Sequence, residues 1–248
     1  MDDPDKPPVK TRQKTGLPKR FYNSVAVRDD GTGFALLLDG KPVRTPGKAK
    51  LLLPTRALAE AVAEEWKAQE DHIDPATMPL TKLANSAIDG VAGHERAVID
   101  DIMAHAGSDL LCYRAGGPRG LVEAQRRSWD PVIAWAKSAL GAPLALAEGI
   151  VHVTQPQASL DRLRERLSDR DPFSLSALHV MTALSGSALL AIAVAEGRLT
   201  PEEAWAAAHV DEDWQISQWG EDAEARERRA SRRRDFGASA CLLALIEA

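Results

Sequence analysis

From Phe21 the pattern of apolar and polar positions is typical of β-strands. Stretches 21–28 and 34–39 flank Asp29 to Gly33, a sequence typical of a hairpin turn. Two shorter apolar stretches, 43–46 and 50–53, predict further strands. This part of the chain therefore predicts a small antiparallel sheet.

From Thr55 the apolar spacing becomes helical, and Thr55 itself is the expected N-cap of the first helix. The same spacing predicts further helices over residues 80–88, 94–106 and 121–140. Within the last of these, Asp130 and Pro131 predict a restart of the helix. Two additional short strands are predicted over 110–114 and 150–153, and if they join the first sheet the first domain reaches about residue 155.

After a linker at Thr154 to Gln157 the pattern is helical throughout. We expect helices over residues 160–167, 172–196 (with Asp171 as N-cap), 200–220 and 222–246. The predicted fold class is α+β, with a β-rich α/β domain over residues 20–155 followed by an all-helical domain over residues 156–248. Residues 1–19 are rich in proline and poor in large apolar side chains, which predicts a flexible tail.

The predicted helix over residues 200–220 has an acid at an apolar position. Its start carries a Thr N-cap with Pro at the first helical position, and Gly220 ends it. Trp205, His209, Glu212, Ile216 and Trp219 share one face at a period of 3.6, so Glu212 lies between two large aromatic residues. Carboxylates are rarely buried without a partner. Glu212 is therefore either neutralised by an arginine inside the fold or available to another molecule.

Composition and charge narrow the function classes. The net charge of -5 argues against a dedicated nucleic-acid binder. Two cysteines, Cys112 and Cys241, give no disulfide framework. No apolar run approaches the ~20 residues of a membrane span, and the acidic N-terminus lacks the apolar region of a secretory signal. We expect a cytoplasmic, bacterial protein.

The common catalytic motifs are missing from the sequence. There is no phosphate-binding glycine loop, no zinc motif of cysteines or histidines and no nucleophile elbow. Ser185 to Ser187 falls inside a predicted helix, where small residues favour close packing. His94 and His105 alone are a weak ligand pair. We therefore predict no catalytic residue, no metal and no cofactor.

Arginines are concentrated between Arg226 and Arg234, mixed with acidic residues. This run favours a solvated or ion-pairing helix, with a binding patch for an acidic partner as the alternative.

Seven segments occur together in the order found in one known family. They are 19–22, 38–46, 65–69, 78–81 with Asn85, 109–114 (D-L-L-C-Y-R), 125–131 with Trp135, and 211–220 (D-E-D-W-Q-I-S-Q-W-G). From Lys19 to the C-terminus the chain resembles the ATP-twelve family, the assembly chaperones of the F-one sector of ATP synthase, also called mitochondrial F-one complex assembly factor 2.

This resemblance implies a protein that is not an enzyme. Members of the family bind the free α subunit of the ATP synthase head before it joins β and shield its interface. Glu212 falls on the acid associated with activity in the family, and the matched segment places Asp211, Gln215 and Trp219 beside it; with Trp205 they form the expected partner-binding set. Trp66 falls on a family tryptophan but has core spacing, so we assign it to the core. The acidic N-terminus departs from the mitochondrial presequence of eukaryotic relatives and fits a bacterial member. We expect a monomer that binds no nucleic acid and does not insert into a membrane.

Physical chemistry is compatible with a surface that binds a protein. Tryptophans dominate interface hot spots, and one carboxylate can orient the partner, for example by engaging an arginine of the α subunit in place of a contact made by β or by nucleotide. An enzyme with an interdomain cleft, using Glu212, His209 and Asp211 as acid and base, is the alternative. A third possibility is a scaffold that binds acidic partners through the arginine run.

Overall fold

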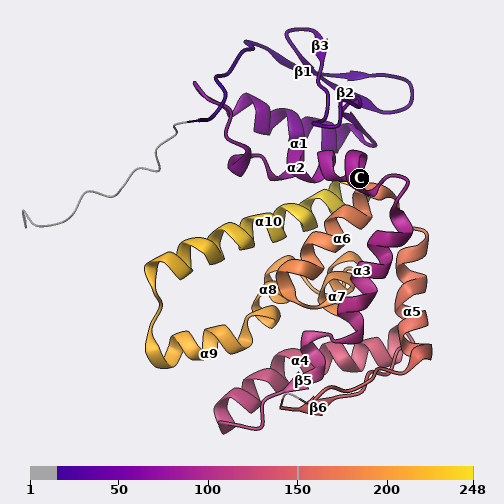
Figure 1. Ribbon diagram of the computed structural model, residues 1–248, viewed down its shortest axis with the longest axis vertical. Coiled ribbons are helices and arrows are strands. Elements are labelled where there is room, and N and C mark those ends of the chain that lie inside the picture. The colour runs from indigo at the N-terminus through magenta and orange to yellow at the C-terminus, as the bar shows by residue number, and fades with distance from the viewer. Residues whose placement is uncertain (1–15, 150, 248) are drawn as a thin grey trace, which may run out of the picture.

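The computed structural model describes residues 16–149 and 151–247 (Figure 1). Its first layer is an antiparallel sheet of four strands, β1 (Val25–Asp29), β2 (Phe34–Leu38), β3 (Lys41–Pro42) and β4 (Leu52–Leu53). β2 is central and pairs with the other three. The predicted sheet and the α+β class are confirmed, although the third strand lies at Lys41–Pro42, just before the predicted 43–46. Residues 1–15 of the predicted tail lie outside the described residues.

The hairpin between β1 and β2 follows from its turn residues. Asp29 pairs with Phe34, the amide of Asp30 donates to the carbonyl of Gly33 at 2.8 Å, and the Asp29 carboxylate accepts from the amide of Gly31 at 2.8 Å. Gly31 has φ of 83°, a conformation that side chains disfavour. The turn therefore fixes the register that turns the apolar residues of β2 inward.

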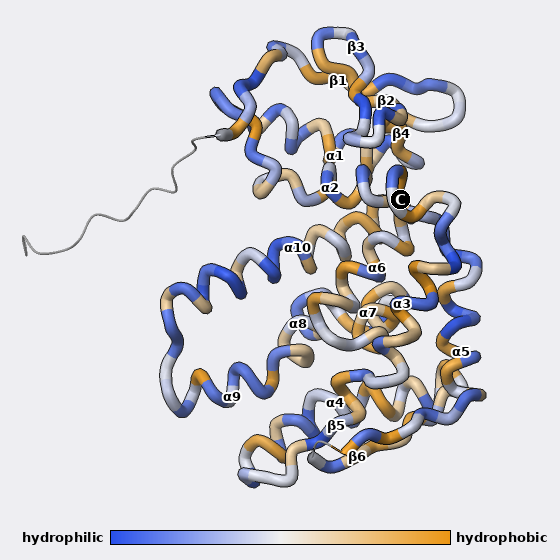
Figure 2. Tube along the Cα trace, in the orientation of Figure 1, coloured by the Kyte–Doolittle hydropathy of each residue, from blue (hydrophilic) through white to orange (hydrophobic). Residues whose placement is uncertain are grey.

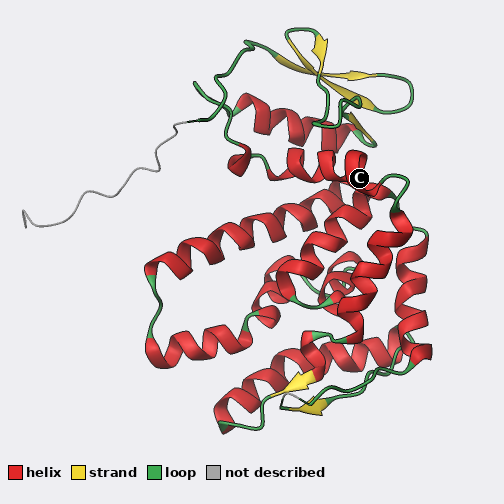
Figure 3. Ribbon diagram, viewed as in Figure 1, coloured by secondary structure: helices red, strands yellow, loops and turns green. Residues whose placement is uncertain are grey.

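Helices make up most of the remaining chain (Figure 3). The predicted caps are present: Thr55 Oγ1 accepts from the amide of Leu58 at 3.2 Å, and the Asp171 carboxylate accepts from the amide of Phe173 at 2.8 Å. The α-helices are α1 (Arg56–Lys67), α2 (Pro79–Ser86), α3 (Glu95–Gly107), α4 (Arg119–Ala139), α5 (Gln157–Ser168), α6 (Pro172–Ser185), α7 (Ala188–Ala195), α8 (Pro201–Ala208), α9 (Val210–Trp219) and α10 (Ala223–Glu247). Shorter helical segments lie between them: the 3-10 helices η1 (Pro75–Thr77) and η3 (Leu110–Cys112), and the π-helix η2 (Ala87–Val91).

The single helix predicted over residues 172–196 is wrong, because it is divided into α6 and α7 at Gly186. Gly186 has φ of 70°, which ends α6, and Ser187 then caps α7 by accepting from the amide of Leu190 at 3.0 Å. The buried carboxylate of Asp109 also accepts from the amide of Leu189 at 3.0 Å. Ser185 to Ser187 therefore forms a junction between helices instead of lying inside one.

Two further sequence predictions are wrong. α4 runs without interruption through Pro131. The second short strand is β6 (Ala147–Glu148), earlier than the predicted 150–153, because Gly149 (φ 76°) turns the chain directly after it. β6 pairs in parallel with β5 (Tyr113–Arg114) in a separate sheet, so these strands do not extend the first one. The domain division at residues 155 and 156 stays a prediction.

One large core cluster includes side chains from β2 through α10. The C-terminal half of α10 packs on α6, α2 and α1, and Thr55 Oγ1 donates to the carbonyl of Leu245 at 2.6 Å. The first half of α10 is hydrophilic (Figure 2) and, together with α9, extends away from the helical body (Figure 1). Among the described residues, no helix has the length and apolar character needed to cross a bilayer.

Candidate functional site

The segment predicted as one helix over residues 200–220 forms two, α8 and α9, and that prediction is wrong at His209. The start is as expected: the amide of Glu203 donates to Thr200 Oγ1 at 3.1 Å, and the amide of Thr200 donates to the Glu203 carboxylate at 2.8 Å. His209 leaves the helical conformation with ψ of 20°. Its ring stacks on Trp205 with centroids 3.8 Å apart, and its Nδ1 lies 2.8 Å from the Trp205 carbonyl oxygen.

The two tryptophans of the predicted face lie in different surroundings. Trp205 is 5% exposed and packs against His209 and Phe236, whose ring centroid lies 5.6 Å away. Trp219, at the end of α9, is 89% exposed. The expected ridge with a tryptophan presented on each side of Glu212 is therefore wrong, because one ring belongs to the core.

Glu212 is partly exposed and loosely paired. Its side chain is 42% exposed, and its Oε2 lies 3.7 Å from Arg229 Nε and 3.9 Å from His209 Nε2. Both distances exceed hydrogen-bond length. Burial lowers the pKa of His209, with the nearby Arg229 adding to the effect, so the imidazole is neutral near pH 7. Arg229 is thus the permanent cation beside Glu212, and the carboxylate remains reachable from solvent.

Neighbouring side chains seat α9 on α4. Gln125 Nε2 donates to the Asp211 carboxylate at 2.7 Å, and Gln125 Oε1 accepts from the amide of Ala115 at 2.8 Å. Trp214 covers Gly120 so closely that a Cβ there would lie 2.3 Å from its ring. Gln215 is exposed. The structure therefore places Glu212, Asp211, Gln215 and Trp219 on one helix, as the sequence predicts.

Sequence reasoning missed the contacts that arginines of α10 make with α9 and α6. Arg229 Nη2 donates to the carboxylate of Asp213, and Arg232 Nη2 donates to the carbonyl of Leu184 at 2.8 Å. Arg229 and Arg232 belong to the arginine run, and these contacts fit the predicted ion-pairing helix. The only signal in the sequence was the coexistence of an acidic and a basic segment close together along the chain.

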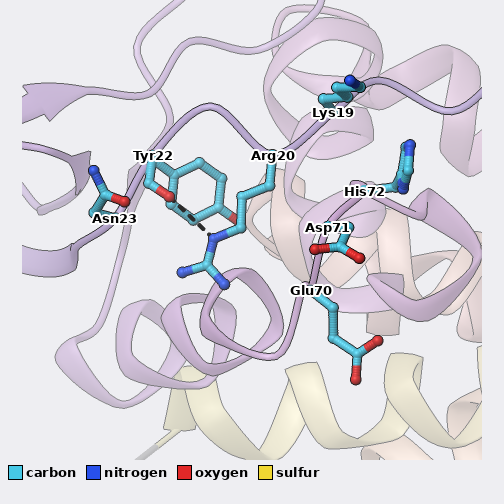
Figure 4. A pocket seen from close by; sticks show the side chains of 7 residues that line it. All are labelled: Lys19, Arg20, Tyr22, Asn23, Glu70, Asp71 and His72. Atoms are coloured by element: carbon cyan, nitrogen blue, oxygen red, sulfur yellow. Dashed lines mark hydrogen bonds between the residues drawn. The ribbon is translucent and has the colours of Figure 1, made fainter.

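A cavity of about 550 Å³ lies elsewhere, beside the start of the first layer (Figure 4). Arg20, which lines it, donates to the carbonyls of Tyr22 and Gln69, so its guanidinium is engaged by the protein itself. Within residues 16–149 and 151–247, no group of three or more His, Cys, Asp or Glu side chains is placed to hold a metal ion. Neither Glu212 nor His209 lines this cavity.

Comparison with known proteins identifies the chain's relatives. The family described as ATP12 chaperone protein matches residues 19–137. The protein atp12, mitochondrial, of Schizosaccharomyces pombe is 23% identical over 233 residues, which cover 88% of this chain and 80% of the relative.

Two crystal structures are similar over nearly the whole chain. The Atu1473 protein of Agrobacterium tumefaciens is 51% identical with a TM-score of 0.89, covering 92% of this chain and 86% of that one. Atp12 from Paracoccus denitrificans is 44% identical with a TM-score of 0.87, covering 92% of this chain and 98% of that one. With this identity over this coverage, and with the acidic and aromatic α9 in place, the chain belongs to the ATP12 chaperone family.

Proposed function

We propose that this chaperone acts in the assembly of ATP synthase by binding the free α subunit of the catalytic head. It holds the subunit interface of α until β joins, and it performs no reaction on its partner. Membership of the ATP12 chaperone family supports the general role. The observation that carries the proposed site is the half-exposed carboxylate of Glu212, which lies at ion-pair distance from one arginine and makes no hydrogen bond to it.

The proposed contact surface lies on α9, where Glu212 is on the side that faces Arg229 of α10. Glu212 engages a cationic side chain of the α subunit, in place of a contact later made by β or by nucleotide. A charged pair of this kind fixes orientation and excludes wrong partners. Asp211 and Gln215 add polar contacts, although Asp211 already accepts a hydrogen bond from Gln125.

Trp219 supplies the apolar anchor of this surface. Its ring is exposed at the end of α9, and burying a tryptophan at an interface is among the most favourable single contacts known. Trp205, whose ring is buried, contributes indirectly: it holds His209 and so fixes the start of α9. We propose that the protein works as a monomer in the bacterial cytoplasm.

The test is binding of purified α subunit to the wild type and to two Glu212 variants. Glu212→Gln removes the charge and is expected to weaken the Kd by about tenfold, which corresponds to ~1.4 kcal/mol. Glu212→Lys reverses the charge and should abolish capture. Glu221→Gln, in the exposed turn after α9, is the matched control and should bind like the wild type.

Circular dichroism must show that each variant keeps the fold. The proposal fails if the folded Glu212→Lys protein captures α subunit as well as the wild type does. It also fails if the wild type, used as bait in a lysate, enriches another protein in place of the α subunit.

A further inference from the structure

Two carboxylates on α9 share one guanidinium on α10. Arg229 Nη2 donates to Asp213, whereas Arg229 Nε lies 3.7 Å from Glu212, beyond hydrogen-bond distance. The Arg229 side chain is 20% exposed, so it is held between the two helices instead of moving freely in solvent. The geometry thus divides the donors of one arginine between two acids.

A single carboxylate could instead take both of these donors. Nε–H and one Nη–H point the same way and form a fork that fits the two oxygens of a single carboxylate. A bidentate pair adds geometric specificity as well as energy to the contact between the two charges. If Arg229 closed its fork on Glu212, both oxygens of the acid proposed to meet the partner would be occupied from within the chain.

We infer that Asp213 is a positioning residue that holds Arg229 away from Glu212 and so keeps Glu212 available to the partner. This inference rests on the proposed function of Glu212 as the contact for the α subunit. Asp213 can hold Arg229 in this way because it lies next to Glu212 on α9. It accepts a hydrogen bond from Arg229 Nη2, the donor that a bidentate pair between Arg229 and Glu212 would need.

The other groups near Glu212 cannot replace Arg229 in this arrangement. His209 is neutral near pH 7, and its Nδ1 faces the carbonyl of Trp205. Arg232 donates to the Leu184 carbonyl at the end of α6. Among the described residues, Arg229 is therefore the cation placed to compete with a partner for Glu212.

The test uses full-length variants and purified α subunit. Asp213→Ala is expected to weaken the Kd by about fivefold or more, because the released Arg229 closes on Glu212. Asp213→Ala combined with Arg229→Met should restore wild-type affinity, and Arg229→Met alone should bind at least as tightly as the wild type. Glu221→Ala removes a nearby exposed charge and should change nothing.

Two binding results overturn the inference. Unchanged affinity in Asp213→Ala means that Asp213 does not protect Glu212. Equal weakening in Asp213→Ala and in the double variant means that Asp213 touches the partner itself, so that Arg229 is irrelevant.

A crystal structure of Asp213→Ala tests the same idea without any partner. Both fork donors of Arg229 should then lie within about 3.0 Å of the Glu212 oxygens, the length of a charge-assisted hydrogen bond. A separation unchanged from 3.7 Å overturns the inference even if the α subunit proves to be the correct partner. If the proposed function is wrong, the wild-type protein will not bind the α subunit. The position of Arg229 in the Asp213→Ala crystal structure does not depend on that binding result.

Discussion

Gly120 offers a way to move α9 without changing any residue proposed to bind the partner. It lies in the first turn of α4, under the ring of Trp214. A Cβ at this position would lie 2.3 Å from Trp214 Cη2 and 2.7 Å from Cζ3. Carbon atoms pack favourably at about 3.5–4.0 Å, so Gly120→Ala forces the indole to retreat by more than about 1 Å.

The expected cost comes from overpacking. Inserting a methyl group into a packed contact costs about 1–3 kcal/mol. The clashing atoms are the far end of one half-buried side chain that can swing outward, so we expect the lower half of that range. Replacing glycine by alanine also stabilises a helix interior by up to about 1 kcal/mol, and this gain is smaller in the first turn of a helix. We therefore expect Gly120→Ala to lower the free energy of unfolding by about 1 kcal/mol.

Gly237→Ala is the matched control, because Gly237 lies inside α10 and a Cβ there meets nothing within 4 Å. Helix propensity alone should raise its stability by about 0.5–1 kcal/mol. Urea unfolding of both variants, followed by circular dichroism, measures the difference. The reasoning is refuted if Gly120→Ala is stabilised as much as Gly237→Ala, since Trp214 would then not be seated on Gly120. The displaced α9 should also weaken binding of the α subunit, with Glu212 intact.

Three further predictions concern single residues. Trp219→Ala should weaken the Kd for α subunit by about tenfold or more and leave the Tm unchanged, because the ring is exposed in the free protein; calorimetry of both quantities checks this. Thr200→Ala removes the capping box of α8 and should cost about 1 kcal/mol in urea unfolding; an unchanged midpoint would contradict the cap. Burial raises the pKa of Asp109 from 3.8 to about 6, so the folded protein binds this proton more tightly than the unfolded chain. The stability of the wild type relative to Asp109→Asn should therefore be highest below about pH 3.8 and fall by about 3 kcal/mol in total as the pH rises through 6 to neutrality; a flat difference between the two proteins would refute this.

The sequence was sufficient to predict the hairpin and the helix caps, because each is formed by residues that are close together along the chain. The Asp29 to Gly33 hairpin and the caps at Thr55, Asp171 and Thr200 were predictable because each depends on residues within a few positions along the chain. Pro131 misled the prediction because a favourable helix-start signal does not compel a break, and α4 continues through it.

The helix breaks depended on contacts that one-dimensional patterns do not record. Gly186 adopts a left-handed conformation at the junction between α6 and α7. There the carboxylate of Asp109, which is far away in sequence, accepts a hydrogen bond from the amide of Leu189 in the first turn of α7. His209 leaves the helix while its ring stacks on Trp205 in the core. Apolar periodicity runs through both positions and so predicted continuous helices.

For the candidate site, the sequence by itself determined which chemistry is present: an acidic and aromatic segment with Glu212 at its centre, followed by a run of arginines. Only the tertiary structure decided that Trp205 is buried, that Trp219 is exposed, and that Arg229 reaches across from α10 to Asp213. The physical reason is that side-chain types are local properties, whereas burial and charge pairing depend on which helices the fold brings together.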